Sequence, residues 1–599
     1  MEFLSLNIKT QLVMCGILGC ISDEDVIPIL LNGVKKLEYR GYDSWGLAVI
    51  QDKIRLIKNT GKISEDEINQ LELKGIVGIV HTRWATHGGV TKENAHPHTS
   101  CRKEIAIVHN GIIENFQEIK RSLLAEGHKF TSQTDSEVIA HLLERYYNKF
   151  KDVKKALLAT VKKIKGNFAF LAIFQDDPNV IIGARKDSPL VIGVGKNKTF
   201  LASDVLSFIE HTDKVIFLDN LEAVIAKKDS LKIFDFKGRE TQKSITQVAW
   251  EACDASKKEF THYTLKEIYE QSSTLKSSLH QDQIKLNEFC NSIKAAKKLF
   301  ITASGTSFHA GLLAKYLFSK ISKVYCETIL ASEFNEVIDW VDKDTIILAI
   351  SQSGETADVL DAVRKAKEKR AKILSIVNVM GSTLDRESDL TLYLNCGPEI
   401  GVAATKSFTS QLTLIYFLAF TMIDNVFRIN KLKRFNDHID FIFKQKDKIV
   451  EIAEKYKNSN DFYFIGRSVH YPIALEGALK LKELSYIHAE GMAAGELKHG
   501  TLALIDKDTP VVVLNPKDQT YHDTLSNALE IKARGAKIIG ISNINNEVYD
   551  DFILLPQIDE LFYPIIEVIP LQMLAYYLAI NRGADVDKPR NLAKSVTVK

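Results

Sequence analysis

Short apolar runs separated by turn residues dominate the first part of the chain, from Cys15 to about Phe236. Examples are CGILGCIS, GLAVI, GIVGIVHT, EIAIVHNG and FAFLAIF. Runs of this length, rich in β-branched residues, predict β-strands. Repeated strands with few helical stretches between them predict stacked antiparallel sheets with helices outside. We therefore expect an α+β fold in this part of the chain.

The pattern changes after the polar stretch Lys237 to Asp282. Apolar runs now alternate with amphipathic helical stretches, as in KKLFITASGTSFHAGLLAKYLF, then TIILAISQSGETADVLDAVRKAKEK, then AKILSIVNV. Alternation at this spacing predicts βαβ units, whose strands are parallel. The second part is therefore expected to be α/β, with doubly wound parallel sheets.

A weak internal repeat divides this second part. DFYFIGRSVHYPIALEGALKLKEL is similar to KLFITASGTSFHAGLLAKYLFSKI, and TPVVVLNP with AKIIGISNI is similar to TIILAISQSGET with AKILSIVNV. Such a repeat predicts two copies of one α/β domain. The expected boundaries are an extension at 1–14, the α+β part at 15–245, a linker at 246–283, the two copies at 284–428 and 452–585, and a C-terminal tail at 586–599.

Length and charge indicate an ordinary multidomain globular protein. A chain of 599 residues exceeds one hydrophobic core, because cores stop growing near about 250 to 300 residues. The 78 basic and 76 acidic side chains are interleaved, so no basic stripe indicates nucleic acid. The longest uncharged apolar run, Leu412 to Ile423, is shorter than the about 20 residues that cross a bilayer, and it predicts a buried helix. We expect neither a nucleic-acid nor a membrane partner.

Seven cysteines are scattered along the chain without Cys-x-x-Cys spacing. An odd, scattered set argues against a disulfide framework and against a zinc site, and it favours a reducing cytoplasm. Residues 1–14 carry Glu2 and Lys9 but no basic leading region, so they are a poor secretory signal.

The segment Ser351-Gln352-Ser353-Gly354-Glu355-Thr356 lies between an apolar strand and a helix. Such a turn presents backbone N–H groups and hydroxyls to an anion, so it could hold a phosphate, although it could also be an ordinary helix cap. Gly305-Thr306-Ser307 forms a second hydroxyl-rich strand-to-helix turn. Because ligands of open α/β sheets bind at the carboxyl ends of strands, the two turns together favour a phosphate site.

Three charged residues of the second copy share one helical face, since Glu476, Lys480 and Glu483 are spaced i, i+4, i+7. They could be an acid/base set or surface salt bridges. His499 before Gly500 could be catalytic or a helix C-terminal residue. Spacing alone does not decide between these alternatives.

Histidines are concentrated in the first part, in HTRWATH (81–87), NAHPH (94–98) and His109-Asn110-Gly111. A metal site is one interpretation, but no His-x-x-x-His pair on a helix is present. Asn110-Gly111 could form a tight turn, or it could offer an amide and a backbone N–H to an oxyanion.

Cys15 directly follows Met14 and precedes Gly-Ile-Leu-Gly. If the chain were cut after Met14, the thiol would lie on the first residue, whose α-amine has a pKa near about 7.7 to 8.0 and can act as a general base. A buried structural cysteine is the alternative.

In order along the chain, CGILGC, RGYDS, HTRWATHG, NAHPH, HNGIIEN and Thr134-Asp135 resemble the N-terminal-nucleophile (Ntn) glutamine amidotransferase domain. SGTS, SQSGET, EIGVAATKSFTSQL, ALEGALKLKELSYIHAE, GELKHG and DKPRNLAKSVTVK resemble two sugar isomerase (SIS) domains. Together they resemble the family of isomerising glutamine–fructose-6-phosphate aminotransferases, or glucosamine-6-phosphate synthases, from Met14 to Lys599.

The resemblance implies a homodimeric enzyme of hexosamine synthesis that uses glutamine and fructose 6-phosphate, with ammonia channelled between its sites and no metal or organic cofactor. In the glutamine site it implies a nucleophile at Cys15, an oxyanion hole at Asn110 and Gly111, substrate contacts at Arg83, Thr86, His87 and Asp135, and a channel gate at Trp84. In the sugar site it implies a Schiff base at Lys594, proton transfer by Glu483, support from Lys480, and ring opening by His499 of the neighbouring subunit. The residues matching its sugar-phosphate pocket are Thr306, Ser307, Ser351, Gln352, Ser353, Thr356 and Val402.

Two alternatives stay open on the residues alone. A phosphate turn does not say which phosphosugar is bound, so another amidotransferase is one alternative, and a sugar-phosphate-sensing regulator is another. Residues 1–14 are expected to be absent from the mature enzyme, either because translation starts at Met14 or because a propeptide is cleaved.

Overall fold

The computed structural model describes residues 15–63, 73–85, 87–248 and 257–596, without the side chain at position 39. The chain divides into two compact units. Unit 1 comprises Met1–Ala255 together with Ser595–Lys599, and unit 2 comprises Ser256–Lys594. Residues 1–14, on which the expectation of an N-terminal extension rests, lie outside the described residues.

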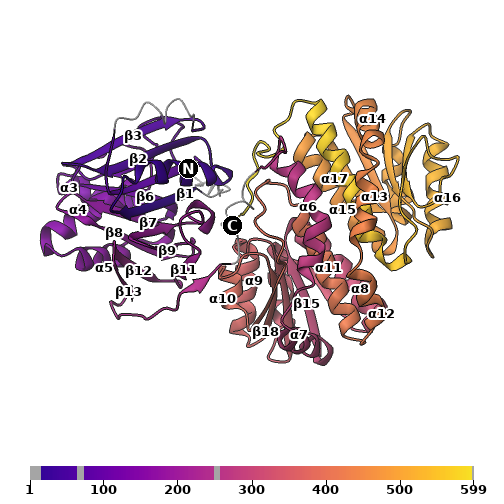
Figure 1. Cartoon of the computed structure of the whole chain (residues 1–599), viewed down its shortest axis with the longest axis horizontal. Helices are drawn as coiled ribbons and strands as arrows, with labels where there is room; N and C mark the ends of the chain where they lie inside the picture. Colours follow the sequence, from indigo (N-terminus) through magenta and orange to yellow (C-terminus); the bar gives the residue numbers. More distant parts are fainter. Residues whose placement is uncertain (1–14, 64–72, 86, 249–256, 597–599) are drawn as a thin grey trace, which may run out of the picture. The chain divides into compact units, whose positions relative to one another are not determined.

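Unit 1 contains two antiparallel sheets that pack face to face (Figure 1). The first sheet has the order β14-β11-β9-β10-β1-β4-β2-β3 and the second the order β13-β12-β8-β7-β6-β5. Their strands are β1 (Gly16–Ser22), β2 (Ser44–Ile50), β3 (Ile54–Thr60), β4 (Val77–Arg83), β5 (His98–Thr99), β6 (Ile105–Ile113), β7 (Gly166–Phe174), β8 (Asp177–Lys186), β9 (Val191–Gly195), β10 (Lys198–Ala202), β11 (Lys214–Phe217), β12 (Glu222–Lys227), β13 (Ser230–Asp235) and β14 (Thr246–Gln247).

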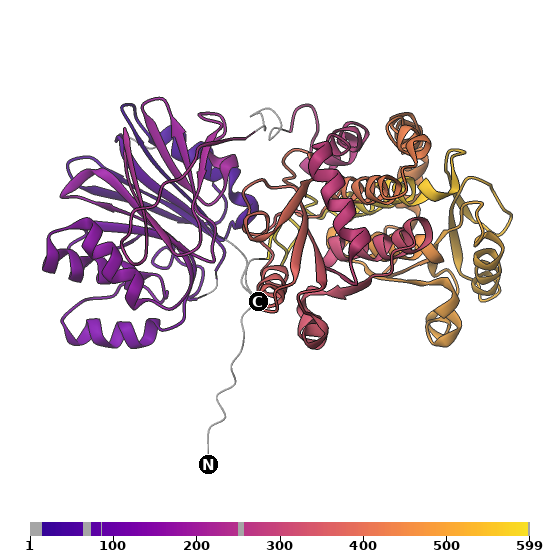
Figure 2. The same cartoon turned by 90° about the horizontal axis from the view of Figure 1, so that it is seen from below.

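Helices cover the outer faces of these sheets. The helix α1 (Ile27–Lys36) packs on β1 and β4, while α3 (Phe116–Ala125), α4 (Glu137–Phe150) and α5 (Val153–Lys163) cover the second sheet (Figure 2). Central strands such as β1 and β4 are buried at every position, because a sheet covers one face and a helix the other. This is why their sequences read as continuous apolar runs rather than as alternating ones. The predicted α+β fold of this part is confirmed.

Unit 2 contains two five-stranded parallel sheets with the same topology. Their orders are β16-β15-β17-β18-β19 and β21-β20-β22-β23-β24, which is 2-1-3-4-5 in both cases. The shared order explains the internal repeat and confirms the predicted doubly wound α/β fold. The strands are β15 (Lys298–Ala303), β16 (Glu327–Leu330), β17 (Thr345–Ser351), β18 (Lys372–Val377), β19 (Leu390–Tyr393), β20 (Asp461–Gly466), β21 (His488–Ala493), β22 (Pro510–Leu514), β23 (Lys537–Ser542) and β24 (Asp551–Leu554).

One hydrophobic core joins the two sheets of unit 2, and long helices fill the space between them (Figure 1). The core helices are α6 (Tyr263–Ser278), α8 (Gly305–Leu317), α11 (Lys406–Thr421), α15 (Tyr471–Ser485) and α17 (Tyr563–Asn581). The remaining α-helices are α7 (Gln283–Ala295), α9 (Ala357–Glu368), α10 (Thr383–Glu387), α12 (Val426–Leu432), α13 (Asn436–Phe443), α14 (Lys446–Tyr456) and α16 (Tyr521–Lys532).

The stretch expected as a linker, 246–283, contains ordered elements. β14 pairs with β11 in unit 1, and α6 places Ile268 and Leu275 in the core of unit 2. The sequence pattern concealed this helix, because its buried face also carries polar residues such as Glu267 and Gln271.

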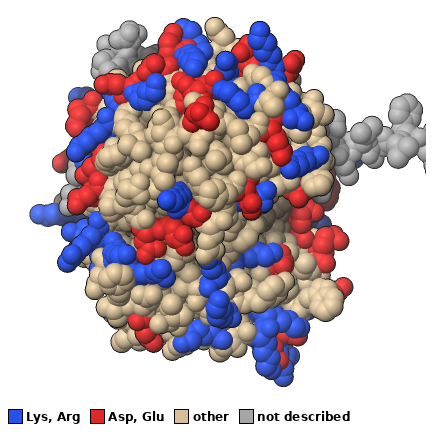
Figure 3. Space-filling model, turned by 90° about the vertical axis from the view of Figure 1, so that its right-hand side faces the viewer, with Lys and Arg blue, Asp and Glu red and all other residues tan. Residues whose placement is uncertain are grey.

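One helical stretch, Glu560–Asn581, is long and apolar enough to cross a membrane, but 94% of its apolar window is buried inside unit 2. It therefore serves as a core helix. The buried helix predicted from Leu412 to Ile423 is confirmed by α11. On the face of the molecule in Figure 3, acidic and basic side chains are intermingled around an uncharged area.

Candidate functional sites in the two units

The thiol of Cys15 lies directly before β1, beside the end of β4. Gly16 pairs with Thr82, and the Trp84 N–H donates a hydrogen bond to Cys15 Sγ at 3.3 Å. Burial raises the pKa of this thiol to about 11, although the Trp84 N–H and the charge of Arg83 act in the opposite direction. The thiol is therefore protonated near neutral pH, and it needs a nearby base to become a nucleophile.

Charged groups of both signs surround this thiol, since Arg83, Asp43 and Asp135 all influence its pKa. The guanidinium of Arg83 donates to the carbonyl oxygens of residues 87–89 at 2.6 to 3.2 Å. Asp135 accepts a hydrogen bond from the Ile113 N–H at 2.7 Å. A cation and an anion held by backbone groups at one site can bind the carboxylate and the ammonium of an amino acid.

The side chain of Asn110 on β6 is buried, and neither atom of its amide has a hydrogen-bond partner among the described residues. The next residue, Gly111, has φ +119°, and a Cβ there would lie 2.0 Å from the carbonyl oxygen of Asn167. A buried amide without a partner is costly unless a ligand satisfies it. The pair is part of β6, paired with β7, and not a hairpin turn.

The other histidines of this region are hydrogen-bonded to protein groups. His81 Nε2 lies 3.0 Å from the carbonyl oxygen of His109, and His109 Nδ1 lies 2.8 Å from Ser136 Oγ. His96 Nδ1 accepts from the His109 N–H at 3.3 Å, and the His81 and His96 rings are stacked 4.0 Å apart. Burial lowers the pKa of His81 to about 3 and that of His109 to about 4. These neutral rings form a packed polar core.

Of the three further residues expected at the glutamine site, the structure describes Trp84 and His87. The Trp84 ring packs edge-on against Tyr42 at 5.5 Å, and the His87 ring lies 5.4 Å from Phe116. Thr86 lies outside the described residues.

In unit 2, the two hydroxyl-rich turns lie at the carboxyl ends of neighbouring strands. β15 leads into α8 and the paired strand β17 leads into α9, and β16 lies on the opposite side of β15. The order of the sheet therefore reverses between β15 and β17, which is where doubly wound sheets bind ligands. Both turns thus lie at the same edge of one sheet.

Internal hydrogen bonds shape the turn before α9. Ser351 Oγ accepts from the Gly354 N–H at 3.1 Å and lies 3.2 Å from Thr356 Oγ1. Gly354 has φ +65°, and a Cβ there would lie 2.0 Å from Ser382 Oγ. The Gln352 and Ser353 side chains are half-buried. The turn thus has a fixed backbone and hydroxyls at a helix N-terminus, which suits an anion.

The other turn contacts the charged face of α15. Thr306 Oγ1 donates to Glu476 at 3.0 Å and accepts from Lys480 Nζ at 3.1 Å. Lys480 also lies 2.5 Å from Glu483, and both Glu476 and Lys480 are fully buried. Burial opposes the charge of Lys480, but Glu476 and Glu483 raise its pKa above the ordinary value. Surface salt bridges, one of the two interpretations of this face, are therefore excluded.

Ser307 and Val402 complete the set expected around the sugar phosphate. Ser307 Oγ accepts from Gln411 Nε2 of α11 at 2.9 Å, so its own proton is left to donate elsewhere. The Val402 N–H donates to the carbonyl oxygen of Asp587 at 3.1 Å. The carboxylate of Asp587 accepts from the first N–H groups of α6, so the C-terminal tail is fastened to this helix.

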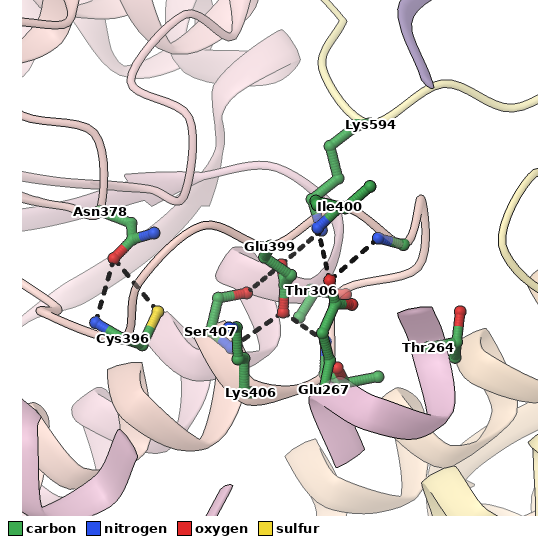
Figure 4. Close-up of polar contacts among 12 residues, drawn as sticks. Thr264, Glu267, Thr306, Asn378, Cys396, Glu399, Ile400, Lys406, Ser407 and Lys594 are labelled. Atoms are coloured by element: carbon green, nitrogen blue, oxygen red, sulfur yellow. Dashed lines mark hydrogen bonds and ion pairs between the residues drawn. The ribbon is translucent and has the colours of Figure 1, made fainter. Parts of the chain in front are cut away.

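The tail brings Lys594 onto a buried carboxylate, as Figure 4 shows. Lys594 Nζ pairs with Glu399, which also accepts from the Thr405 N–H at 2.9 Å and from the Ser407 N–H at 3.0 Å. Burial opposes ionisation of Glu399, but Lys594 and Ser407 lower its pKa to about 2. Glu399 also acts on the pKa of Lys480, which links the tail to the charged face of α15.

A second carboxylate in this region, that of Glu267, has a raised pKa where that of Glu399 is lowered. Burial and the neighbouring charge of Glu399 raise the pKa of Glu267 to about 7, and its carboxylate accepts from the Ile400 and Gly401 N–H groups. Sequence reasoning missed both Glu267 and Glu399. Glu399 lies in EIGVAATKSFTSQL, a segment noted only for its resemblance, and Glu267 lies in the stretch expected as a linker.

His499 is exposed at the end of the short helix Ala494–His499. No hydrogen bond or ion pair of its ring is present within the described residues of this chain. The structure therefore places Cys15 near Trp84, Arg83 and Asp135. It also joins Thr306 to Lys480 and Lys480 to Glu483, but it does not bring His499 to them.

Family models match both units. The glutamine amidotransferase domain matches residues 81–210, and the SIS domain matches twice, at residues 292–421 and 455–582. These matches lie inside the segments expected as the amidotransferase part and the two α/β copies.

Relatives match the chain over nearly its whole length. A protein of Methanothermobacter thermautotrophicus, named glutamine–fructose-6-phosphate aminotransferase [isomerizing], is 47% identical over 593 residues, covering 98% of this chain and 100% of the relative. A protein of Aquifex aeolicus with the same name is 44% identical, with the same coverage. The solved C-terminal domain of glucosamine-fructose-6-phosphate aminotransferase from Francisella tularensis is 38% identical, with a TM-score of 0.51, covering 56% of this chain and 100% of that one.

Proposed function

Because the chain belongs to the family of isomerising glutamine–fructose-6-phosphate aminotransferases, we propose that its two units divide one reaction between a thiol site and a lysine site. The enzyme converts D-fructose 6-phosphate and L-glutamine into D-glucosamine 6-phosphate and L-glutamate. Family membership favours this reaction over the two alternatives that the sequence left open, which were an amidotransferase acting on another phosphosugar and a sugar-phosphate-sensing regulator. The roles of individual residues are the proposal that follows.

In unit 1, the freed α-amine of Cys15 takes the proton of its own thiol, and the thiolate attacks the side-chain amide carbon of glutamine. The single observation that best supports this site is the buried, unpartnered amide of Asn110, which together with the Gly111 N–H can stabilise the oxyanion. Arg83 binds the α-carboxylate and Asp135 the α-ammonium, while Thr86 and His87 line the site. Trp84 gates the passage of ammonia to unit 2.

This mechanism requires that Cys15 is the first residue of the active enzyme. A peptide nitrogen has no basic lone pair, and burial keeps the thiol pKa at about 11, so the thiol of an internal Cys15 would remain protonated. We therefore propose that residues 1–14 are absent from the active form.

In unit 2, the two turns hold the phosphate through Thr306, Ser307, Ser351, Gln352, Ser353 and Thr356, with Val402 nearby. Lys594 forms a Schiff base with the ketone of fructose 6-phosphate, and Glu483 moves the proton between C1 and C2. Lys480, held between carboxylates, supports Glu483. Replacing either Glu483 or Lys594 should abolish sugar conversion and leave glutaminase activity. Loss of both activities in a folded variant would contradict this division.

We further propose a homodimer in which His499 opens the sugar ring in the neighbouring subunit. Its exposed position supports this role. Mixing His499→Ala and Lys594→Ala proteins should restore partial activity through hybrid dimers, because each hybrid holds one intact site. Absence of rescue despite measured subunit exchange would count against a shared site.

A cytoplasmic location is proposed as well, because the six cysteines that the structure describes are all free. The assay that tests the whole proposal supplies glutamine and fructose 6-phosphate without added metal and measures glutamate and glucosamine 6-phosphate. Glutamate without glucosamine 6-phosphate would indicate that the units are not coupled as proposed.

A further inference from the structure

Four side chains of unit 1 that take no part in the proposed reaction converge on one point. Cys101 lies in the turn between β5 and β6, His128 follows α3, and His141 and Glu144 lie on one face of α4. One ligand atom of each residue lies within 4.8 Å of the others. We propose that this cluster is a structural metal site that binds a divalent transition metal, with zinc as the preferred ion.

Five distances between the ligand atoms, from 3.1 to 3.6 Å, are close to the edges of a tetrahedron around one ion. Cys101 Sγ lies 3.5 Å from both His128 Nδ1 and His141 Nδ1, and the two Nδ1 atoms are 3.2 Å apart. Glu144 Oε2 lies 3.1 Å from His128 Nδ1 and 3.6 Å from His141 Nδ1. Zinc bonds of about 2.0 to 2.3 Å in tetrahedral geometry give edges of about 3.3 to 3.8 Å. The two shortest distances, 3.1 and 3.2 Å, therefore have to open by only about 0.1 to 0.2 Å when an ion binds.

Charge and hydrogen bonds also suit a metal. A thiolate and a carboxylate neutralise a divalent cation, and two imidazoles complete a set typical of zinc. The Lys129 N–H donates to Cys101 Sγ at 3.4 Å, and the Cys101 N–H donates to Glu144 at 3.2 Å. On the far side of the His141 ring, Nε2 lies 3.7 Å from Glu137. This is an ion-pair distance and not a hydrogen bond, and a small shift of either side chain would let the Glu137 carboxylate orient a metal-bound His141.

Burial and access fit a closed structural site. His141 is fully buried, while His128 and Glu144 are 13% and 8% exposed and Cys101 is exposed, so the ion can enter from the surface. All four tetrahedral positions are taken by protein ligands, which leaves none open for a substrate. The ion would tie the β5–β6 turn and the loop after α3 to α4.

The scattered cysteines argued against zinc, because only one cysteine takes part. The available signal was His141-x-x-Glu144, a pair on one helical face, but the other two ligands are 13 and 40 residues away from His141 along the chain. Only the fold brings the four together. The proposed site is distinct from the packed histidines around His81.

The alternative is a metal-free cluster in which a protonated histidine pairs with the carboxylates. To decide, the full-length protein is purified through a tag without histidines, and its metal content is measured by plasma mass spectrometry. We expect about one zinc per chain in the wild type, as for other structural sites, and less than about a tenth of that in a Cys101→Ala/His128→Ala double variant. His211→Ala, which removes an exposed imidazole of unit 1, is the matched control and should keep the metal.

A second measurement guards against misfolding of the double variant. Wild-type protein stripped with a chelator and reloaded with Co²⁺ should show the thiolate charge-transfer and tetrahedral absorption bands, and reloading with zinc should raise the melting temperature of unit 1 by several degrees. A wild type that holds no metal after reloading, or a double variant that keeps as much metal as the wild type, would overturn the proposal.

Discussion

The ion pair between Lys594 and Glu399 gives the most demanding test of the sugar site. In Glu399→Gln the side chain keeps nearly the same size, and an amide oxygen can still accept from the Thr405 and Ser407 N–H groups. What is lost is the negative charge opposite the Lys594 ammonium. We expect the C-terminal tail to lose its fixed position, so that Lys594 no longer meets the ketone in the correct geometry.

The magnitude follows from the pKa of Glu399. A value near 2 in place of the ordinary 4.5 corresponds to about 3 kcal/mol of preference for the ionised form in the folded protein. This is an upper limit for the loss in unfolding free energy, because a released tail would return Lys594 to water. Misplacement of a reacting group by about 1 Å can cost about 100-fold in rate. We therefore expect sugar conversion to fall by at least about 10-fold.

The effect has a defined pH dependence. A depressed carboxyl pKa contributes stability that is present above the unfolded value of about 4.5 and is lost as the pH falls toward 2. The stability difference between wild type and Glu399→Gln should thus be largest at pH 7 and shrink below about pH 5. Hydrogen exchange of peptides covering residues 399–420 in increasing urea measures it locally, which avoids assuming two-state unfolding of the whole chain.

The assay compares glucosamine 6-phosphate formation, glutaminase activity and borohydride trapping of fructose 6-phosphate on Lys594. Glutaminase should stay within about two-fold of wild type, since it belongs to the other unit, while trapping should fall with sugar conversion. Glu336→Gln removes an exposed carboxylate of unit 2 and is the matched control. Wild-type sugar conversion and trapping in Glu399→Gln would refute the positioning role of the ion pair.

Three further predictions follow from the same geometry. Gly111→Ala should remove glutaminase activity and destabilise unit 1 by about 3 kcal/mol or more, measured by denaturant unfolding, because its Cβ would lie 2.0 Å from the Asn167 carbonyl oxygen; a stable, active variant would contradict the backbone assignment. Glu483→Gln should lower sugar conversion at least about 100-fold with glutaminase retained, and a smaller loss would assign the proton transfer elsewhere. An alanine inserted between Met14 and Cys15 should abolish glutaminase, whereas the same insertion before Met14 should not, as activity and N-terminal mass spectrometry will show.

Local patterns in the sequence determined much of the architecture. The apolar runs before Phe236 predicted the strands of two antiparallel sheets, and the strand-helix alternation predicted both parallel sheets. These predictions succeeded because side chains on one face recur about every 3.6 residues in a helix and every 2 residues in a strand. Apolar residues on the buried face therefore show which element a segment forms. The turn around Gly354 was also predictable, since its serines and glycine meet a local backbone requirement.

Only the tertiary structure decided which of these side chains are buried and which partners they contact. Whether Lys480 is a surface or a buried cation depends on packing across α15, and Glu399 meets Lys594 from 195 positions away along the chain. The same holds for Cys101 and His141, 40 positions apart. Electrostatic and metal-binding roles depend on distances through space and on burial, and spacing along a chain encodes these only within one helix or turn.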